Sequence, residues 1–203
     1  MLSAFTAALV ALIPITNPVG ALAVYAGMTG TSQPERTRRM AWRTGMWVFA
    51  ILGAFTLVGA LIMSAFGISL PALQIAGGLV VAHSGFGMLD NSERVTDTER
   101  THASTKEDIS FTPMALPLIA GPGAIGVVIA LTARHPGVEA RIGILVATAA
   151  LGIVISLLLR YGTPWVTRIG PTGVGALVRV MGFLILAIGV ELVAHGTLSL
   201  LGR

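Results

Sequence analysis

Two apolar stretches of the chain are interrupted by proline and glycine at matching places. The first runs from Pro14 to Ala21, and the second runs from Pro117 to Ala124. Proline removes a backbone N–H and clashes with the carbonyl four residues back, and glycine adopts backbone angles that a helix forbids. A helix through either stretch must therefore break or kink. We place the two breaks at Asn17-Pro18 and Gly121-Pro122.

The composition is that of a multi-pass membrane protein. Hydrophobic residues make up 54% of the chain, charged residues make up 11%, and the mean hydropathy is +0.85. Soluble domains carry about 25% charged residues. We therefore expect the lipid bilayer to surround most of the chain. In hydrocarbon, each unsatisfied backbone group costs several kcal/mol, so the two breaks are expected to line a cavity.

The positive charge of the chain does not indicate nucleic-acid binding. The 13 Lys and Arg residues outnumber the 9 acidic residues. They lie between the apolar spans, where membrane proteins place basic residues, and no aromatic residues are interleaved with them. The chain has no cysteine, which excludes disulfides, thiolate metal sites and thiol catalysis.

Hydropathy predicts six transmembrane helices. Their approximate bounds are 3–28, 42–65, 72–89, 111–132, 142–159 and 174–200. The second span, at 1.5 Å per residue, is about 36 Å long, enough to cross a bilayer core of about 30 Å. We expect a solvated loop at 29–39, a hydrophilic loop at 90–110, and a connection rich in Pro and Gly between the fifth and sixth spans.

The two halves of the chain look like copies of one unit. Residues 74–77 match residues 179–182, and the two breaks are related by a similar offset of about 104 residues. Three spans per half is an odd number, so the second copy must enter the membrane with the opposite orientation. The predicted fold is all-α: one membrane domain, 1–203, with repeat one at 1–89, a linker at 90–110 and an inverted repeat two at 111–203.

The distribution of basic residues predicts the orientation. The loops after spans one, three and five hold ten Lys and Arg residues, and the opposite side holds Arg134, Arg141 and Arg203. The side with more positive charge faces the cytoplasm. We therefore expect both termini outside and the 90–110 loop in the cytoplasm.

The chemistry of a broken helix predicts a small dipolar ligand. The second half-helix offers free N–H groups and a positive dipole end to an anion, and the unwound carbonyls suit a cation. A zwitterionic amino acid satisfies both. Thr16 and Asn17 add polar side chains to the first break, whereas Ala120 and Gly121 add none to the second. The candidate binding residues are Thr16, Asn17, Pro18, Gly20, Gly121, Pro122, Gly123 and Ala124. The alternative is that these residues only kink helices for packing.

Three ionisable residues within the spans are candidates for proton coupling. Glu191 lies in the sixth span and His195 is one turn later on the same face, so the pair can share a hydrogen bond or pass a proton. His83 lies in the third span. The alternative for His195 is that it reaches interfacial water near the span end. No sequence motif indicates a metal site, a cofactor or soluble-type catalysis.

Four segments give the chain a family resemblance. They are Asn17–Gly20, Ala72–Gly78, Pro117–Ala124 and Arg179–Gly182. These segments resemble the signatures of the MarC family of integral membrane proteins, which includes the SnatA-like small neutral amino acid transporters. The resemblance covers nearly the whole chain.

The resemblance implies six inverted spans and proton-coupled uptake of glycine and alanine. It assigns the substrate site to the two breaks. Two positions depart from the family pattern, because Glu191 stands where Gln is usual and His195 stands where Asp is usual. We expect a non-enzymatic transporter of the inner or plasma membrane. The alternatives are a membrane-embedded enzyme using Glu191, His195 and His83, and a drug-efflux or accessory membrane protein.

Overall fold

A computed structural model describes residues 1–30, 33–90 and 108–202. All regular structure within these residues is helical. The elements in chain order are α1 Leu2–Thr16, α2 Pro18–Thr29, α3 Pro34–Phe66, α4 Leu70–Leu89, η1 Ser110–Ile119, α6 Pro122–Arg134, α7 Val138–Tyr161 and α8 Thr163–Leu200. The predicted hydrophilic loop lies largely outside the described residues.

The helices account for the predicted membrane spans. By length and apolar character, α3, α4, α7 and the Thr172–Leu200 part of α8 are each able to cross a membrane. The pairs α1–α2 and η1–α6 are bent by 44° and 63°, and the count rises to six spans if each pair is one span. The prediction of an all-α membrane fold with breaks at Asn17-Pro18 and Gly121-Pro122 is confirmed. The inverted repeat stays a prediction.

Two predicted loops are helical instead. α3 begins at Pro34 rather than near residue 42, because proline fits the first turn of a helix, where its missing N–H is not needed. The connection before the sixth span is the start of α8. Only Gly170 is non-helical there, with φ 72° and ψ 169°, so the helix bends at this glycine and continues.

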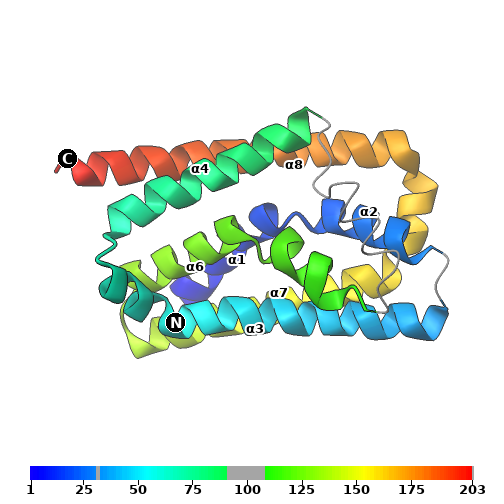
Figure 1. The fold of residues 1–203 in the computed structure, drawn as a ribbon, viewed down its shortest axis with the longest axis horizontal. Coiled ribbons are helices and arrows are strands. Elements are labelled where there is room, and N and C mark those ends of the chain that lie inside the picture. Colours follow the sequence, from blue (N-terminus) through cyan, green and yellow to red (C-terminus); the bar gives the residue numbers. More distant parts are fainter. Residues whose placement is uncertain (31–32, 91–107, 203) are drawn as a thin grey trace.

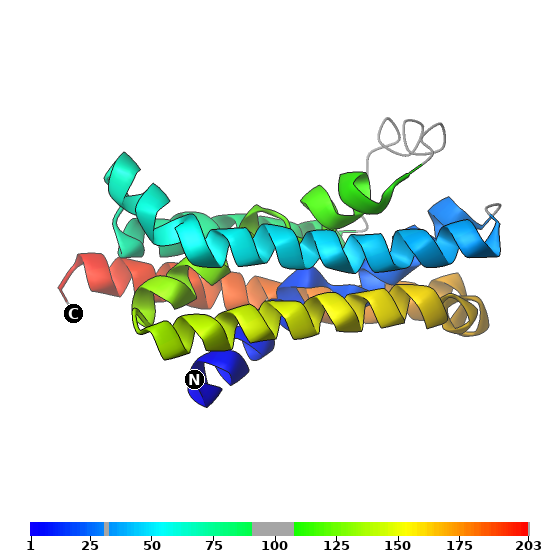
Figure 2. The same ribbon diagram turned by 90° about the horizontal axis from the view of Figure 1, so that it is seen from below.

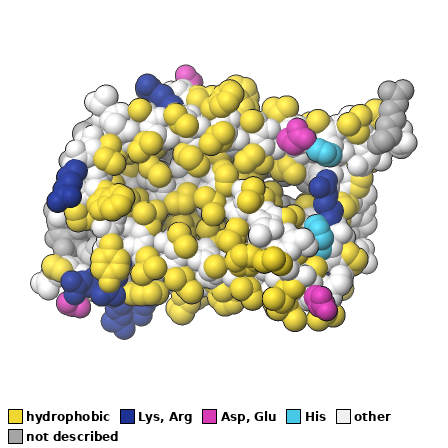
Figure 3. Space-filling model, turned by 180° about the vertical axis from the view of Figure 1, so that it is seen from behind, with side chains coloured by type: hydrophobic (Ala, Val, Ile, Leu, Met, Phe, Trp, Pro, Cys, Tyr) yellow, Lys and Arg dark blue, Asp and Glu magenta, His cyan; other side chains and the backbone are white. Residues whose placement is uncertain are grey.

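The helices form three layers (Figure 1). α4 runs along α8, α3 runs along α7, and the two broken pairs lie between these outer layers. Figure 2 shows α3 and α7 side by side from a second direction. Both chain ends lie toward the same end of the molecule. On the face seen in Figure 3, apolar side chains form a broad band, and basic side chains lie toward its two ends.

Glycines bring α4 and α8 into backbone contact. A Cβ atom on Gly78 would lie 2.6 Å from the Gly189 carbonyl oxygen, and one on Gly189 would lie 2.7 Å from the Gly78 oxygen. Gly85 faces the Gly182 oxygen in the same way, at 2.8 Å. Hydrophobic burial drives helix association little in a bilayer, so this close packing is what holds the pair together.

Polar contacts tie the broken second segment to its neighbours at both ends. Asp108 accepts a hydrogen bond from the Ser110 amide (2.9 Å) and forms an ion pair with Arg43 of α3. Partial burial opposes ionisation of Asp108, but these hydrogen bonds outweigh it and hold the pKa of the carboxyl below its ordinary value. At the other end, the buried Gln74 amide, oriented with its oxygen toward Arg134, accepts two hydrogen bonds of 2.8 and 2.9 Å.

The glycine contact predicts a large difference between two Gly→Ala substitutions in α8. Gly189→Ala should lower the free energy of unfolding by about 1–3 kcal/mol, because the new methyl group overlaps α4 backbone. Gly175→Ala meets no atom within 4 Å and should be neutral or slightly stabilising. Reversible unfolding in mixed micelles measures both values. Equal stability of the two variants would mean that α4 and α8 do not pack through these glycines.

Candidate functional site

The first break is closed by its own side chains. Asn17 adopts a left-handed conformation, with φ 43° and ψ 69°, and its side-chain oxygen accepts a hydrogen bond of 3.2 Å from the Gly20 amide at the start of α2. The Thr16 hydroxyl donates to the Leu12 carbonyl at 2.9 Å. Both side chains are fully buried. The polar groups of this break are therefore used to satisfy its own backbone.

Gly20 is required by the position of Asn17. A Cβ atom at residue 20 would overlap the Asn17 side-chain nitrogen. The same nitrogen lies 3.7 Å from the sulfur of Met88, so it has no open space behind it. The glycine therefore leaves room for the side chain that caps α2.

The second break is left open. Gly121 precedes α6 in an extended conformation, and no side chain among the described residues caps this helix. Pro122 has no N–H, so the first turn presents the amides of Gly123 and Ala124, which have no partner within the helix. Gly121 itself lies against the Pro117 carbonyl. A Cβ atom on Gly121 would be 2.5 Å from the Pro117 carbonyl oxygen.

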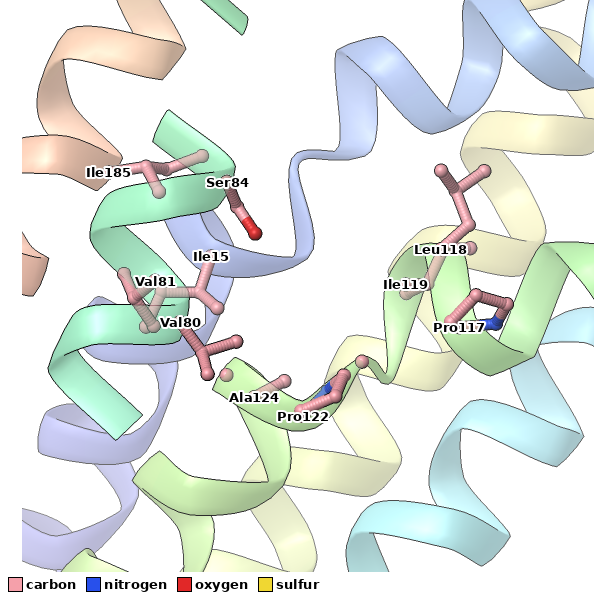
Figure 4. Close-up of a pocket in the computed structure, with 12 residues that line it drawn as sticks. Ile15, Val80, Val81, Ser84, Pro117, Leu118, Ile119, Pro122, Ala124 and Ile185 are labelled. Atoms are coloured by element: carbon pink, nitrogen blue, oxygen red, sulfur yellow. The ribbon is translucent and has the colours of Figure 1, made fainter. Parts of the chain in front are cut away.

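A cavity of about 200 Å³ lies at this open break (Figure 4). Its lining consists of Ile15, Val80, Val81, Ser84, Pro117, Leu118, Ile119, Gly121, Pro122, Gly123, Ala124 and Ile185. The walls are mostly aliphatic, and the Ser84 hydroxyl points inward from α4. None of these lining residues carries an ionisable group. The cavity therefore combines backbone polar groups with a neutral, apolar wall.

The breaks lie deep within their spans. α6 has 13 residues, so the second break is about 20 Å from the end of that helix at Arg134. α2 has 12 residues, which puts the first break about 18 Å from Thr29. If each bent pair is one span across a hydrocarbon core of about 30 Å, these distances put both breaks well inside the membrane.

The structure brings together half of the predicted binding residues. Gly121, Pro122, Gly123 and Ala124 line the cavity, whereas Thr16, Asn17, Pro18 and Gly20 do not. The first half of the chain contributes Ile15 and the α4 residues instead. A role for any of these residues in ligand binding stays a prediction.

Sequence reasoning missed Ser84. It is the only hydroxyl residue within α4, and a polar residue in an apolar span is a recognised signal of function. The prediction attended to the breaks and to ionisable groups, and it did not consider which face of the third span points toward the fourth.

The predicted coupling residues lie outside the cavity. His195 Nδ1 is 3.1 Å from the Glu191 carboxylate, so the expected pairing is present. The His195 and Glu191 side chains are 55% and 70% exposed, and His83 is also exposed. Within the described part of the chain, no three His, Asp or Glu residues come together as metal ligands. A role in proton coupling stays a prediction.

These features define a multi-pass helical membrane protein with two broken spans and a cavity at one of them. The model of the MarC family of integral membrane proteins matches residues 2–201. The chain belongs to the MarC family.

Curated relatives support the same assignment. The inner membrane protein MarC of Salmonella typhimurium is 33% identical, over 95% of this chain and 93% of the relative. The proteins of the same name from Escherichia coli and Citrobacter koseri are 33% and 34% identical over the same shares of the chains. No solved structure matches the chain. The family, the names of these relatives and the apolar helices together support a multi-pass inner membrane protein.

The self-capped first break predicts opposite effects of two substitutions in α2. Gly20→Ala should lower the free energy of unfolding by about 1–2 kcal/mol, because the methyl group displaces the Asn17 cap. Gly27→Ala, in the same helix with nothing within 4 Å, should leave stability unchanged or raise it. Unfolding in mixed micelles tests the pair. If Gly20→Ala were as stable as Gly27→Ala, Asn17 would not be the cap of α2.

Proposed function

We propose that this protein is a secondary transporter that moves small neutral amino acids across the membrane by alternating access. The observation that carries the proposal is the cavity at the second break, where backbone amides without a partner inside α6 stand in a lining without ionisable side chains. A net charge brought into such a cavity would have no counter-charge, and burying it would be costly. A ligand that is neutral overall but charged at both ends avoids that cost.

The two ends of the break suit the two charges of a zwitterion. The Gly123 and Ala124 amides and the positive end of α6 favour a carboxylate. The last carbonyls of η1, next to Leu118 and Ile119, have no following helical turn and favour an ammonium group. The Ser84 hydroxyl adds one more hydrogen-bonding group on the α4 side.

The walls limit the size of the ligand. About 200 Å³ is smaller than the roughly 300–1,000 Å³ typical of pockets for drug-sized ligands. Val81 lies close behind Gly123, since a Cβ atom on Gly123 would be 2.7 Å from the Val81 side chain. A glycine- or alanine-sized ligand fits these limits, and proton-coupled uptake of such ligands is the activity that the family resemblance implies.

Alternating access would follow from an inverted repeat, which we also propose. The packing supports it, because exchanging the two halves maps observed helix pairs onto other observed helix pairs or onto themselves. Spans two and five pack on each other, as do spans three and six, and contacts of α1 with α7 correspond to contacts of η1 with α3. An experimental structure in which residues 1–89 fail to superpose on 111–203 by a two-fold rotation would overturn this arrangement.

The transport proposal predicts that filling the cavity abolishes binding without unfolding the protein. Ser84→Leu should remove the stabilisation of purified protein by glycine or alanine, and should stop uptake in proteoliposomes. Ser84→Ala loses only one hydrogen bond to a charged group and should weaken binding about tenfold. Ser64→Leu makes the same chemical change on an exposed position of α3 and serves as the control.

Three outcomes separate the alternatives. Ligand-dependent stabilisation that survives Ser84→Leu would place the site elsewhere. Stabilisation by a divalent metal alone would favour the hypothesis of a membrane-embedded enzyme. Stabilisation by a drug alone would favour the hypothesis of a drug-efflux protein. Either of the last two results would contradict amino acid transport.

The excess of basic residues supports an orientation with both termini outside and the 90–110 loop in the cytoplasm. The chain has no native cysteine, so single cysteines report their own accessibility. Leu201→Cys, at the end with the termini, should react with a membrane-impermeant maleimide in intact cells. Gln33→Cys, before α3, should react only after permeabilisation. The reverse pattern would invert the orientation.

A further inference from the structure

An apolar groove lies on the outer surface between α3 and α7. The two helices meet at Gly45 and Gly152, where a Cβ atom on Gly45 would overlap the Gly152 carbonyl. Beside this contact the surface is hollowed by about 280 Å³. The groove is lined by Trp42, Gly45, Met46, Phe49, Ala149, Gly152, Ile153 and Ser156. It shares no residue with the cavity at the second break.

The groove is exposed to the surroundings of the protein. Met46 is 57% exposed, Ile153 is 53% exposed, and Trp42 and Phe49 are about 40% exposed. In a membrane-embedded helix pair such residues face acyl chains rather than water. The hollow has the elongated, apolar lining that suits one hydrocarbon chain.

One end of the groove carries positive charge. Arg160 follows Ser156 by four residues on α7, and Arg39 precedes Trp42 by three residues on α3, so each continues the stripe that lines the groove. The two helices are antiparallel, which puts both arginines at the end where α3 begins and α7 ends. Basic side chains are also visible at that end of the apolar band in Figure 3.

Arg160 has an unused hydrogen-bond donor. Its Nε atom is buried, and it has no hydrogen-bond partner within the described residues. The guanidinium lies over the ring of Tyr161, with its carbon 5.1 Å from the ring centre. Buried donors without a partner are costly, so a small movement of this side chain toward an anion at the end of the groove would relieve the cost. Tyr161 and Trp42 are aromatic residues of the kind that mark the membrane–water boundary.

We propose that this groove binds an anionic phospholipid. One acyl chain lies along Phe49, Met46 and Ile153, and the phosphate group contacts Arg160 and Arg39. Basic pockets between transmembrane helices bind anionic headgroups in this manner, and each arginine near the headgroup strengthens binding about fivefold. The apolar lining selects a lipid over a free phosphate, because the phosphate alone fills only the basic end.

Lipid titration of the full-length protein in detergent tests the proposal. Native mass spectrometry would count bound phosphatidylglycerol and phosphatidylcholine with identical acyl chains. The wild-type chain should retain phosphatidylglycerol more strongly. Arg160→Gln should weaken that binding about fivefold, and Ala149→Phe should abolish it by filling the groove. Arg168→Gln removes an exposed arginine of α8 outside the groove and should change nothing.

Three results would overturn the proposal. Equal retention of the two lipids would mean that the groove binds bulk lipid without preference for the headgroup. Loss of binding with Arg168→Gln as large as with Arg160→Gln would indicate a diffuse charge effect. Binding of inorganic phosphate that competes with the lipid and survives Ala149→Phe would indicate an anion site without an acyl chain.

Discussion

The structure depends on the absence of hydrogen-bonding partners in the hydrocarbon core. A helix satisfies its own backbone, so an interruption creates donors and acceptors that the bilayer does not satisfy. This chain interrupts two spans and treats the interruptions differently. At the first, Asn17 returns its side chain to the Gly20 amide and Thr16 donates back to Leu12. At the second, no side chain among residues 1–30, 33–90 and 108–202 does so, and a cavity lies beside the break.

The outer helix layers enclose the two broken segments. α4 against α8 and α3 against α7 meet through glycines, so their backbones approach more closely than larger residues would allow. The broken segments lie between these two pairs (Figure 1). The second of them, η1 with α6, is anchored by polar contacts near its ends, Asp108 with Arg43 and Arg134 with Gln74. A rigid frame therefore surrounds the segments whose own backbone hydrogen bonding is incomplete.

Local rules recovered the spans and the breaks because proline, glycine and hydropathy act through sequence neighbours. The positions of Pro18 and Pro122 were enough to place both interruptions. The same rules failed at Pro34, where proline starts a helix rather than preventing one. They also did not indicate that the polar side chains of the first break hydrogen-bond to its own backbone. Whether Asn17 faces a ligand or caps a helix depends on the left-handed backbone at that residue, and hydropathy carries no information on it. Ser84 was overlooked for a related reason, since its value depends on which span faces α4.

The difference between the breaks has a consequence for which positions of the chain can vary. At the first break, the polar residues hold the fold, so a change at Asn17 or Gly20 lowers the free energy of unfolding. At the second break, the polar groups that face the cavity belong to the backbone, and Ser84 and Ile185 join the lining from α4 and α8. Substitutions in α4 and α8 can therefore change the size and polarity of the cavity without altering either interruption. Different parts of the chain thus set the stability of the fold and the shape of the cavity.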